Sequence, residues 1–277
     1  MFTNEDKPKI LISGGGIAGL TLAYWLDQAG FVPLVIEQAQ GLRRDGYAVD
    51  FYSTGYDVAE RMGIVADLQQ RQLQVDYLTF VDGAGNITAK LNMDTMRRAA
   101  HGKYMALMHY TLEEALYAAV KNRVEVRFGV SIEALHQTPE AVSVTFTDGS
   151  QEHFDLVVGA DGIHSNVRRL VFGPEAQFAR PLGYYTAAFK ATARDELARS
   201  FVNYAEPERQ ASVYPSDQPD VWASSFTFKA EDEGEIPRNQ RLAKLKQVYA
   251  GMQWITPQLL DNLLNPDAIF MDTVAQI

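Results

Sequence analysis

Cysteine is absent from the 277 residues of this chain. Disulfides, thiol nucleophiles and cysteine-ligated zinc or iron–sulfur sites are therefore excluded, and a chain without disulfides is typical of the cytoplasm. Long apolar runs are also missing, because no window approaches the roughly 20 residues that a membrane helix needs. The first residues, MFTNEDKPKI, have no signal-peptide pattern. We therefore expect a cytoplasmic protein without a membrane partner.

An excess of basic residues is missing as well. Lys and Arg number 25 against 35 Asp and Glu, which gives a net charge of −10. Nucleic-acid-binding proteins normally carry a basic footprint, so we expect no nucleic-acid partner. The histidines show no metal-ligand spacing with carboxylates, so we expect no metal site; they are His101, His109, His136, His153 and His164.

The remaining composition is that of a globular protein, with 47% apolar and 22% charged residues. The length suits one large domain or two moderate ones. Residues 9–13 read as a buried strand, 17–29 as a helix that Gly30 ends, and 33–37 as a second strand. Strand, helix and strand within so short a stretch predict the opening unit of a parallel sheet.

A glycine-rich loop lies between that first strand and helix. Gly14, Gly16 and Gly19 spell G-x-G-x-x-G, and Glu37 ends the second strand about 20 residues later, which is the context that a dinucleotide site requires. The glycines permit a tight turn, close approach to a pyrophosphate and close packing of helix on strand. The helix N-terminus offers N–H groups to the phosphates, and Glu37 accepts hydrogen bonds from a ribose. The alternative is a glycine turn without a ligand. The predicted binding residues here are Gly14, Gly15, Gly16, Ile17, Ala18, Gly19, Glu37 and Gln38.

The next segments favour FAD over NAD as the dinucleotide. An NAD domain usually continues with alternating helices and strands. This chain instead continues with a basic loop, GLRRDGYAVDF, a helix at about 55–72 and a hairpin at 75–81 and 87–91. A further helix is expected over 111–121, with Thr111 as N-cap and Glu114 completing a capping box.

A second motif stands at residues 155–169, which read DLVVGADGIHSNVRR. A buried strand at 156–158 runs into Gly159-Ala160-Asp161-Gly162, and a short basic helix follows. Taken alone, this stretch is equally an ordinary strand, turn and helix, since Asp-Gly is a common turn pair.

The two motifs together resemble those of the FAD-dependent aromatic hydroxylases, the class A flavoprotein monooxygenases, whose relatives include tetracycline-inactivating oxygenases. The family's second motif has the form D-x-x-x-G-A-D-G-x-x-S-x-V-R. It is matched here by Asp155, Gly159, Ala160, Asp161, Gly162, Ser165, Val167 and Arg168. The resemblance implies an α/β protein, a Rossmann-like FAD-binding fold with an inserted, mainly antiparallel β-sheet substrate domain. We place the FAD domain at 1–174 and the substrate sheet with its helices at 175–277, the chain returning toward the FAD domain at its end.

The resemblance also implies a role for individual residues. Arg43 or Arg44 would lie at the flavin edge of the site, and Asp161 with Gly162 would place FAD. A backbone group of Val130 would contact the adenine of FAD. The alternative is that Val130 only packs within the sheet. His109 stands where the family often has an arginine that reaches FAD. Because histidine is a weaker cation, His109 either still touches FAD or is structural.

His164 matches a position near NADPH in some members of the family, and an exposed histidine at a helix start is the alternative. The family's third motif, Gly-Asp before a helix, is missing, because the 277 residues contain no Gly-Asp pair. The segment 267–277 resembles the stretch that precedes it, so we expect a chain that stops just short of this motif.

The activity implied is that of an FAD-dependent monooxygenase. NADPH or NADH would reduce FAD, and a C4a-hydroperoxyflavin formed with O2 would hydroxylate a small aromatic or polyketide-like substrate. Since the flavin carries the chemistry, no catalytic acid or base is named. The alternatives are a related reductase or halogenase, or a truncated, non-catalytic fragment; the protein would be a monomer or homodimer. Aromatic residues of 184–228 would stack on the substrate or form core; they are Tyr184, Tyr185, Phe189, Tyr214, Trp222, Phe226 and Phe228.

Overall fold

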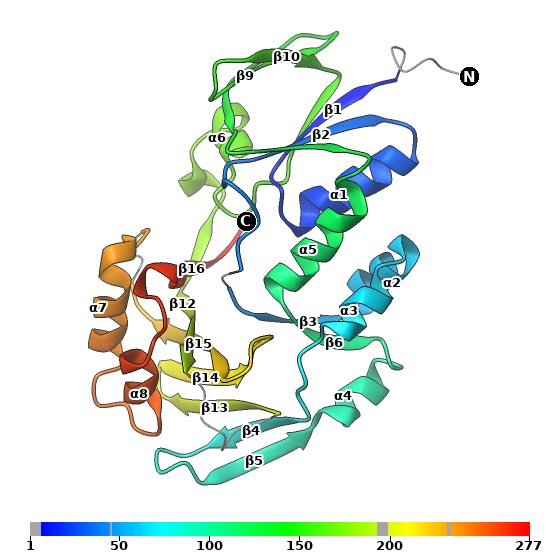
Figure 1. Ribbon diagram of the computed structural model, residues 1–277. Coiled ribbons are helices and arrows are strands. Elements are labelled where there is room, and N and C mark those ends of the chain that lie inside the picture. Colours follow the sequence, from blue (N-terminus) through cyan, green and yellow to red (C-terminus); the bar gives the residue numbers. More distant parts are fainter. Residues whose placement is uncertain (1–6, 45, 193–198, 232–233) are drawn as a thin grey trace. The chain divides into compact units, whose positions relative to one another are not determined.

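The computed structural model describes residues 7–44, 46–192, 199–231 and 234–277 (Figure 1). The chain divides into two compact units, each assembled from separate stretches of sequence. The glycine-loop unit contains residues up to Arg43, then Leu112–Arg180 and finally Gln276–Ile277. The sheet unit contains Arg44–Thr111 and Pro181–Ala275.

A four-stranded parallel sheet forms the centre of the glycine-loop unit. Its order is β11 (Leu156–Gly159), β1 (Lys9–Ser13), β2 (Val32–Glu37) and β7 (Glu125–Phe128). Helix α1 (Ile17–Gln28) connects β1 to β2, and Gly30 follows it with φ 88°. That left-handed conformation is the helix stop expected of a glycine, so the predicted strand, helix and strand are confirmed.

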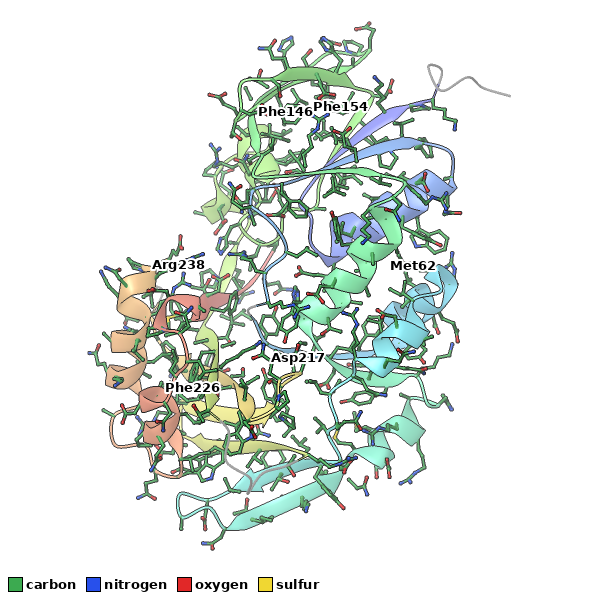
Figure 2. The ribbon with its side chains drawn as sticks, in the orientation of Figure 1. Met62, Phe146, Phe154, Asp217, Phe226 and Arg238 are labelled. Carbon is green, nitrogen blue, oxygen red and sulfur yellow. The ribbon has the colours of Figure 1, made fainter. Side chains whose placement is uncertain are left out.

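A smaller antiparallel sheet and two short helices complete this unit. The sheet has the order β10 (Gln151–Phe154), β9 (Val142–Phe146) and β8 (Ile132–Gln137), and α6 (Asn166–Val171) and the 3-10 helix η2 (Glu175–Gln177) follow β11. Phe146 and Phe154, both labelled in Figure 2, meet edge to face with ring centroids 6.4 Å apart. Together with Leu11 and Ile36 they join the small sheet to the parallel sheet in one apolar core.

A seven-stranded sheet organises the sheet unit. Its order is β16 (Phe270–Gln276), β12 (Arg180–Thr192), β15 (Val221–Lys229), β14 (Arg209–Pro215), β13 (Ser200–Glu206), β4 (Tyr77–Val81) and β5 (Ile87–Asn92). Most neighbours are antiparallel, whereas β13 and β4 are parallel. The predicted, mainly antiparallel sheet is therefore confirmed. The unit also contains β3 (Ala48–Tyr52) paired with β6 (Tyr104–Met108), and α2 (Ser53–Met62), α3 (Val65–Gln70), α4 (Met93–Ala99), α7 (Arg238–Val248), α8 (Thr256–Asp261) and η4 (Pro266–Ala268).

Residues 44–111 belong to the sheet unit, although the sequence analysis assigned them to the FAD domain. The reason is the parallel pairing of β4 with β13, which brings Leu78 opposite Phe201. A hairpin pattern predicts only the local pairing of β4 with β5, so this distant partner had no local signal.

Helices α7 and α8 pack on one face of the large sheet, and most of the aromatic residues lie in that core. Tyr185, Phe226 and Phe228 are almost fully buried there against Leu245 and Tyr249. The predicted stacking surface is therefore mostly structural core. Tyr214 lies on the opposite face, where its ring stacks on Phe201 with centroids 4.6 Å apart.

Two local predictions were wrong. The single helix expected over 55–72 is two helices, α2 and α3, because Gly63 takes φ 77° between them. Helix α5 (His109–Val120) begins two residues before the predicted N-cap Thr111, directly after β6. Thr111 is buried inside the helix and is not its cap. Within the described ranges, no helix combines the length and the apolarity that crossing a bilayer demands.

Candidate functional site

The first glycine joins the two sequence motifs. Gly14 has φ 117°, and a Cβ built on it would lie 2.3 Å from the carbonyl oxygen of Ala160. The Gly14 N–H donates to Ile36 O at 2.8 Å, and the Ala160 N–H donates to Ser13 O at 2.7 Å. Only glycine permits both the left-handed conformation and this approach. The motif at 155–169 therefore lies directly against the glycine loop.

The other glycines differ in the space around them. A Cβ on Gly19 would lie 1.9 Å from Gly14 O, so the third glycine allows close packing of helix on loop. Among the described residues, a Cβ on Gly16 would meet only Glu113 Oε1, at 3.6 Å, so its surroundings there are open. Gly16 caps α1 without a side-chain hydrogen bond, and the first turn, which includes Ile17 and Ala18, has no acidic residue. The N–H groups at this helix end are thus suited to an anion.

Glu37 lies at the end of β2 and closes the loop from the other side. Its Oε2 accepts from Gly15 N–H at 2.9 Å and its Oε1 accepts from Ala39 N–H at 2.8 Å. Each carboxylate oxygen has a second lone pair, so two hydroxyl donors of a ribose still find an acceptor. Gln38, the next residue, has an exposed side chain.

Asp161 supplies an unsatisfied acceptor beside the glycine loop. Its Oδ2 accepts from Val167 N–H at 3.0 Å and lies 3.5 Å from Ser13 Oγ. Its Oδ1 is buried and has no hydrogen-bond partner in the part of the chain that the structure describes. Buried carboxylate oxygens are normally hydrogen-bonded, so this atom fits a donor group from a bound molecule. Gly162, which follows, is exposed and has φ 80°.

Three other predicted residues of the glycine-loop unit are Val130, Arg43 and His164. The Val130 N–H donates to Glu37 O at 3.1 Å, so an adenine contact would have to use its carbonyl group. Arg43 is exposed and is the last residue of the first stretch of this unit. His164 is exposed, and its Nδ1 lies within hydrogen-bond distance of Glu175 Oε1, at 3.0 Å.

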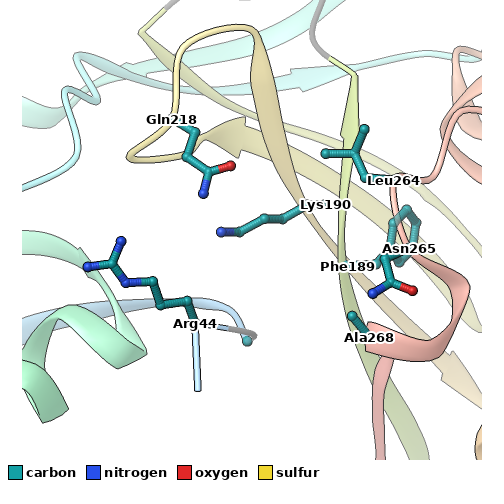
Figure 3. A pocket seen from close by; sticks show the side chains of 8 residues that line it. Arg44, Phe189, Lys190, Gln218, Leu264, Asn265 and Ala268 are labelled. Carbon is teal, nitrogen blue, oxygen red and sulfur yellow. The ribbon is translucent and has the colours of Figure 1, made fainter. Parts of the chain in front are cut away.

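His109 and Arg44 belong to the sheet unit. His109 is the first residue of α5; its N–H donates to Tyr47 O at 2.9 Å, and its ring lies 5.4 Å from the Tyr47 ring. Arg44 lines a cavity of about 250 Å³ in this unit, together with residues of β12 and of the 264–268 segment (Figure 3). The predicted site residues are thus divided between the two units.

A polar network at this cavity was not predicted from the sequence. Lys190 lines the cavity from β12, and its Nζ donates to Tyr110 Oη at 3.3 Å. The Tyr110 hydroxyl donates in turn to Asp217 Oδ1, whose distance to Lys190 Nζ is 3.9 Å. A lysine within an otherwise apolar strand, FKAT, was the only local signal.

The family model described as "FAD binding domain" matches residues 7–256. This chain belongs to that FAD-binding family. The predicted resemblance to class A flavoprotein monooxygenases is confirmed, and with it the assignment to FAD-dependent oxidoreductases.

Individual relatives agree with the family. An uncharacterized protein of Mycobacterium tuberculosis is 34% identical over 274 residues, which are 97% of this chain and 73% of that protein. A flavin-dependent monooxygenase of Legionella longbeachae is 26% identical over 97% of this chain and 69% of its own length. The crystal structure of tetracycline destructase Tet(51) superposes with a TM-score of 0.81 at 28% identity, over 98% of this chain and 70% of that one.

More distant structures share the fold. HpxO of Klebsiella pneumoniae, solved with FAD and uric acid, has a TM-score of 0.78 at 19% identity, over 97% of this chain and 68% of that one.

Proposed function

We propose that this protein is an FAD-dependent monooxygenase that takes NADPH or NADH as co-substrate and hydroxylates a small aromatic or polyketide-like molecule with O2. The observation that carries the proposal is the convergence of three features on one loop. They are the open helix end at Gly16, the carboxylate of Glu37 and the buried Oδ1 of Asp161, which has no partner among the described residues. Each feature suits a different part of a dinucleotide, namely a phosphate, a ribose and a further hydroxyl donor.

In this proposal the chain's own groups bind and orient the cofactor. The N–H groups of Gly16, Ile17 and Ala18, at the N-terminus of α1, would hold the pyrophosphate. Glu37, already held by Gly15 and Ala39, presents its remaining lone pairs to the adenosine ribose. Bound FAD would supply the oxidation–reduction chemistry.

Asp161 has a positioning role in the proposal. Its Oδ2 is anchored by the Val167 N–H, so Oδ1 stays where a ligand hydroxyl reaches it. Gly162 contributes its turn, and Val130 its carbonyl. Arg43, Arg44, Gln38 and His109 are proposed cofactor contacts on the family resemblance alone.

The names of the relatives support the reaction type. A relative in Legionella longbeachae is called a flavin-dependent monooxygenase, and one in Sarocladium schorii is called an FAD-dependent monooxygenase. A related reductase is the second candidate, because the same loop would bind FAD for either reaction.

The first test is the visible spectrum of the purified chain titrated with FAD, followed by NADPH under air. We expect a bound-flavin spectrum that bleaches with NADPH and recovers with O2. A chain that takes up no FAD would refute the proposal. NADPH oxidation without oxygen insertion into any phenolic or polyketide candidate would favour the reductase.

A further inference from the structure

The cavity lined by Lys190 has the chemistry of an anion site. Lys190, Arg44, Gln218 and Asn265 all offer N–H donors to its interior or rim. Phe189, Leu264, Ala268 and Gly46 supply the apolar remainder of the wall. Its volume of about 250 Å³ is close to the lower end of the roughly 300–1,000 Å³ of small-molecule pockets, so it suits one substituted ring.

The Lys190 ammonium is held in place, but not all of its N–H donors are used. Only 17% of its side chain is exposed. In the described ranges its Nζ makes one hydrogen bond, to Tyr110 Oη at 3.3 Å. An ammonium has three N–H donors, so two remain for another acceptor. In the close view, the Lys190 amine points into the space between Gln218 and Arg44 (Figure 3).

Asp217 compensates the Lys190 charge only in part. Its Oδ1 lies 3.9 Å from Nζ, at the outer limit of an ion pair, and the same oxygen already accepts the Tyr110 hydroxyl proton. Tyr110 itself is almost fully buried, so its hydroxyl is a fixed acceptor on one side of the amine. A largely buried cation with free donors is costly unless an anion or strong acceptor joins it.

We propose that Lys190 is the substrate-positioning cation of this cavity, and that it selects small aromatic molecules carrying an oxyanion, either a carboxylate or an ionised phenol. The assignment rests on the proposed monooxygenase function only in that the bound molecule is called a substrate. Tyr110 and Asp217 act through Lys190, because they fix the direction of its amine.

The test is a calorimetric titration of the FAD-free chain with two probes of the same shape, benzoate and benzamide. We expect benzoate to bind at least about tenfold more tightly, since a hydrogen bond to a charged partner is worth more than a neutral one. Lys190→Met should remove this preference, and Lys190→Arg should retain most of it. Lys229→Met is the matched control, because Lys229 lies on β15 of the same sheet and pairs at the surface with Glu208; it should leave the preference unchanged.

A second probe separates the two sources of the oxyanion. 4-Nitrophenol changes colour on ionisation, so binding as the yellow anion that depends on Lys190 would identify a phenolate site. Equal binding of benzoate and benzamide, together with no Lys190-dependent ionisation of 4-nitrophenol, would overturn the proposal. If Lys190→Met fails to fold, the proposal is still tested by comparing benzoate with benzamide in the unaltered chain and in Lys190→Arg. FAD uptake is measured separately, so failure here leaves the cofactor assignment unaffected.

Discussion

Replacing Glu37 by glutamine removes the charge of the carboxylate and nearly preserves the shape of the side chain. In the structure, the two carboxylate oxygens accept one backbone N–H each, from Gly15 at 2.9 Å and from Ala39 at 2.8 Å. The amide has only one oxygen, so its NH2 group must face one of these two N–H donors. The same NH2 group would also face a ribose hydroxyl that needs an acceptor. The substitution therefore removes charged acceptors from both the loop and the proposed ligand.

The expected loss follows from these contacts. A hydrogen bond to a charged group contributes about 1.5–3 kcal/mol, and an unsatisfied buried donor costs a similar amount. The loss of one such hydrogen bond to FAD would raise the Kd for FAD about tenfold to hundredfold. The Kd is measured by the quenching of flavin fluorescence on titration with protein, for the unaltered chain and for Glu37→Gln.

A matched control is Glu133→Gln, because Glu133 is an exposed residue of β8 in the same unit. It should leave the Kd unchanged. Thermal melting without FAD shows whether Glu37→Gln still folds. A folded Glu37→Gln chain that binds FAD as tightly as the unaltered chain would refute the assignment of Glu37 to the ribose.

Three further predictions concern single positions. Gly14→Ala should lower the melting temperature, since φ 117° and a carbonyl oxygen 2.3 Å from the new Cβ leave no room; an unchanged melt would contradict this. Asp161→Asn should weaken FAD binding about tenfold with little change in the FAD-free melt, because an amide replaces the unpartnered oxygen; unaltered affinity would exclude the proposed contact. Hydrogen bonds from Tyr204 and Arg209 lower the pKa of Glu206 below 4.5. Its stabilising effect is thus present above pH 4.5 and lost as the pH falls through the lowered folded pKa. The difference in melting temperature between the chain and Glu206→Gln should shrink in acid, and a constant difference would contradict this.

The glycine loop was predictable because its determinants are local. The spacing of Gly14, Gly16 and Gly19, the preceding strand and the following helix all lie within 9–28. Positive φ at Gly14 is a property of the residue itself, so the sequence pattern carries the geometry. The unpartnered state of Asp161 Oδ1 was not predictable, because it depends on how Ser13 and Val167 surround that side chain.

The Lys190 network and the division into units depend on distant pairing. Tyr110 is 80 residues from Lys190 and 107 from Asp217 in the sequence. The register of β12, β15 and β14 brings Lys190 toward the end of β14 that precedes Asp217, and helix α5 contributes Tyr110. No local pattern encodes these distant pairings. The capping-box prediction at Thr111 was wrong for a related reason: α5 continues directly from β6, so helix formation begins at His109, before the pattern.

The parallel sheet of the glycine-loop unit also has a consequence for folding. Its inner strand β1 pairs on one side with β2 and on the other with β11, and the Lys9–Asp155 hydrogen bond at that edge spans 146 residues. At about 5–20 residues per second, ribosomes need roughly seven to thirty seconds to synthesise that interval. During this time the strand KILIS has one unpaired edge, which is a template for incorrect strand pairing. Completion of the nucleotide-binding sheet during synthesis must therefore wait for the second motif to leave the ribosome.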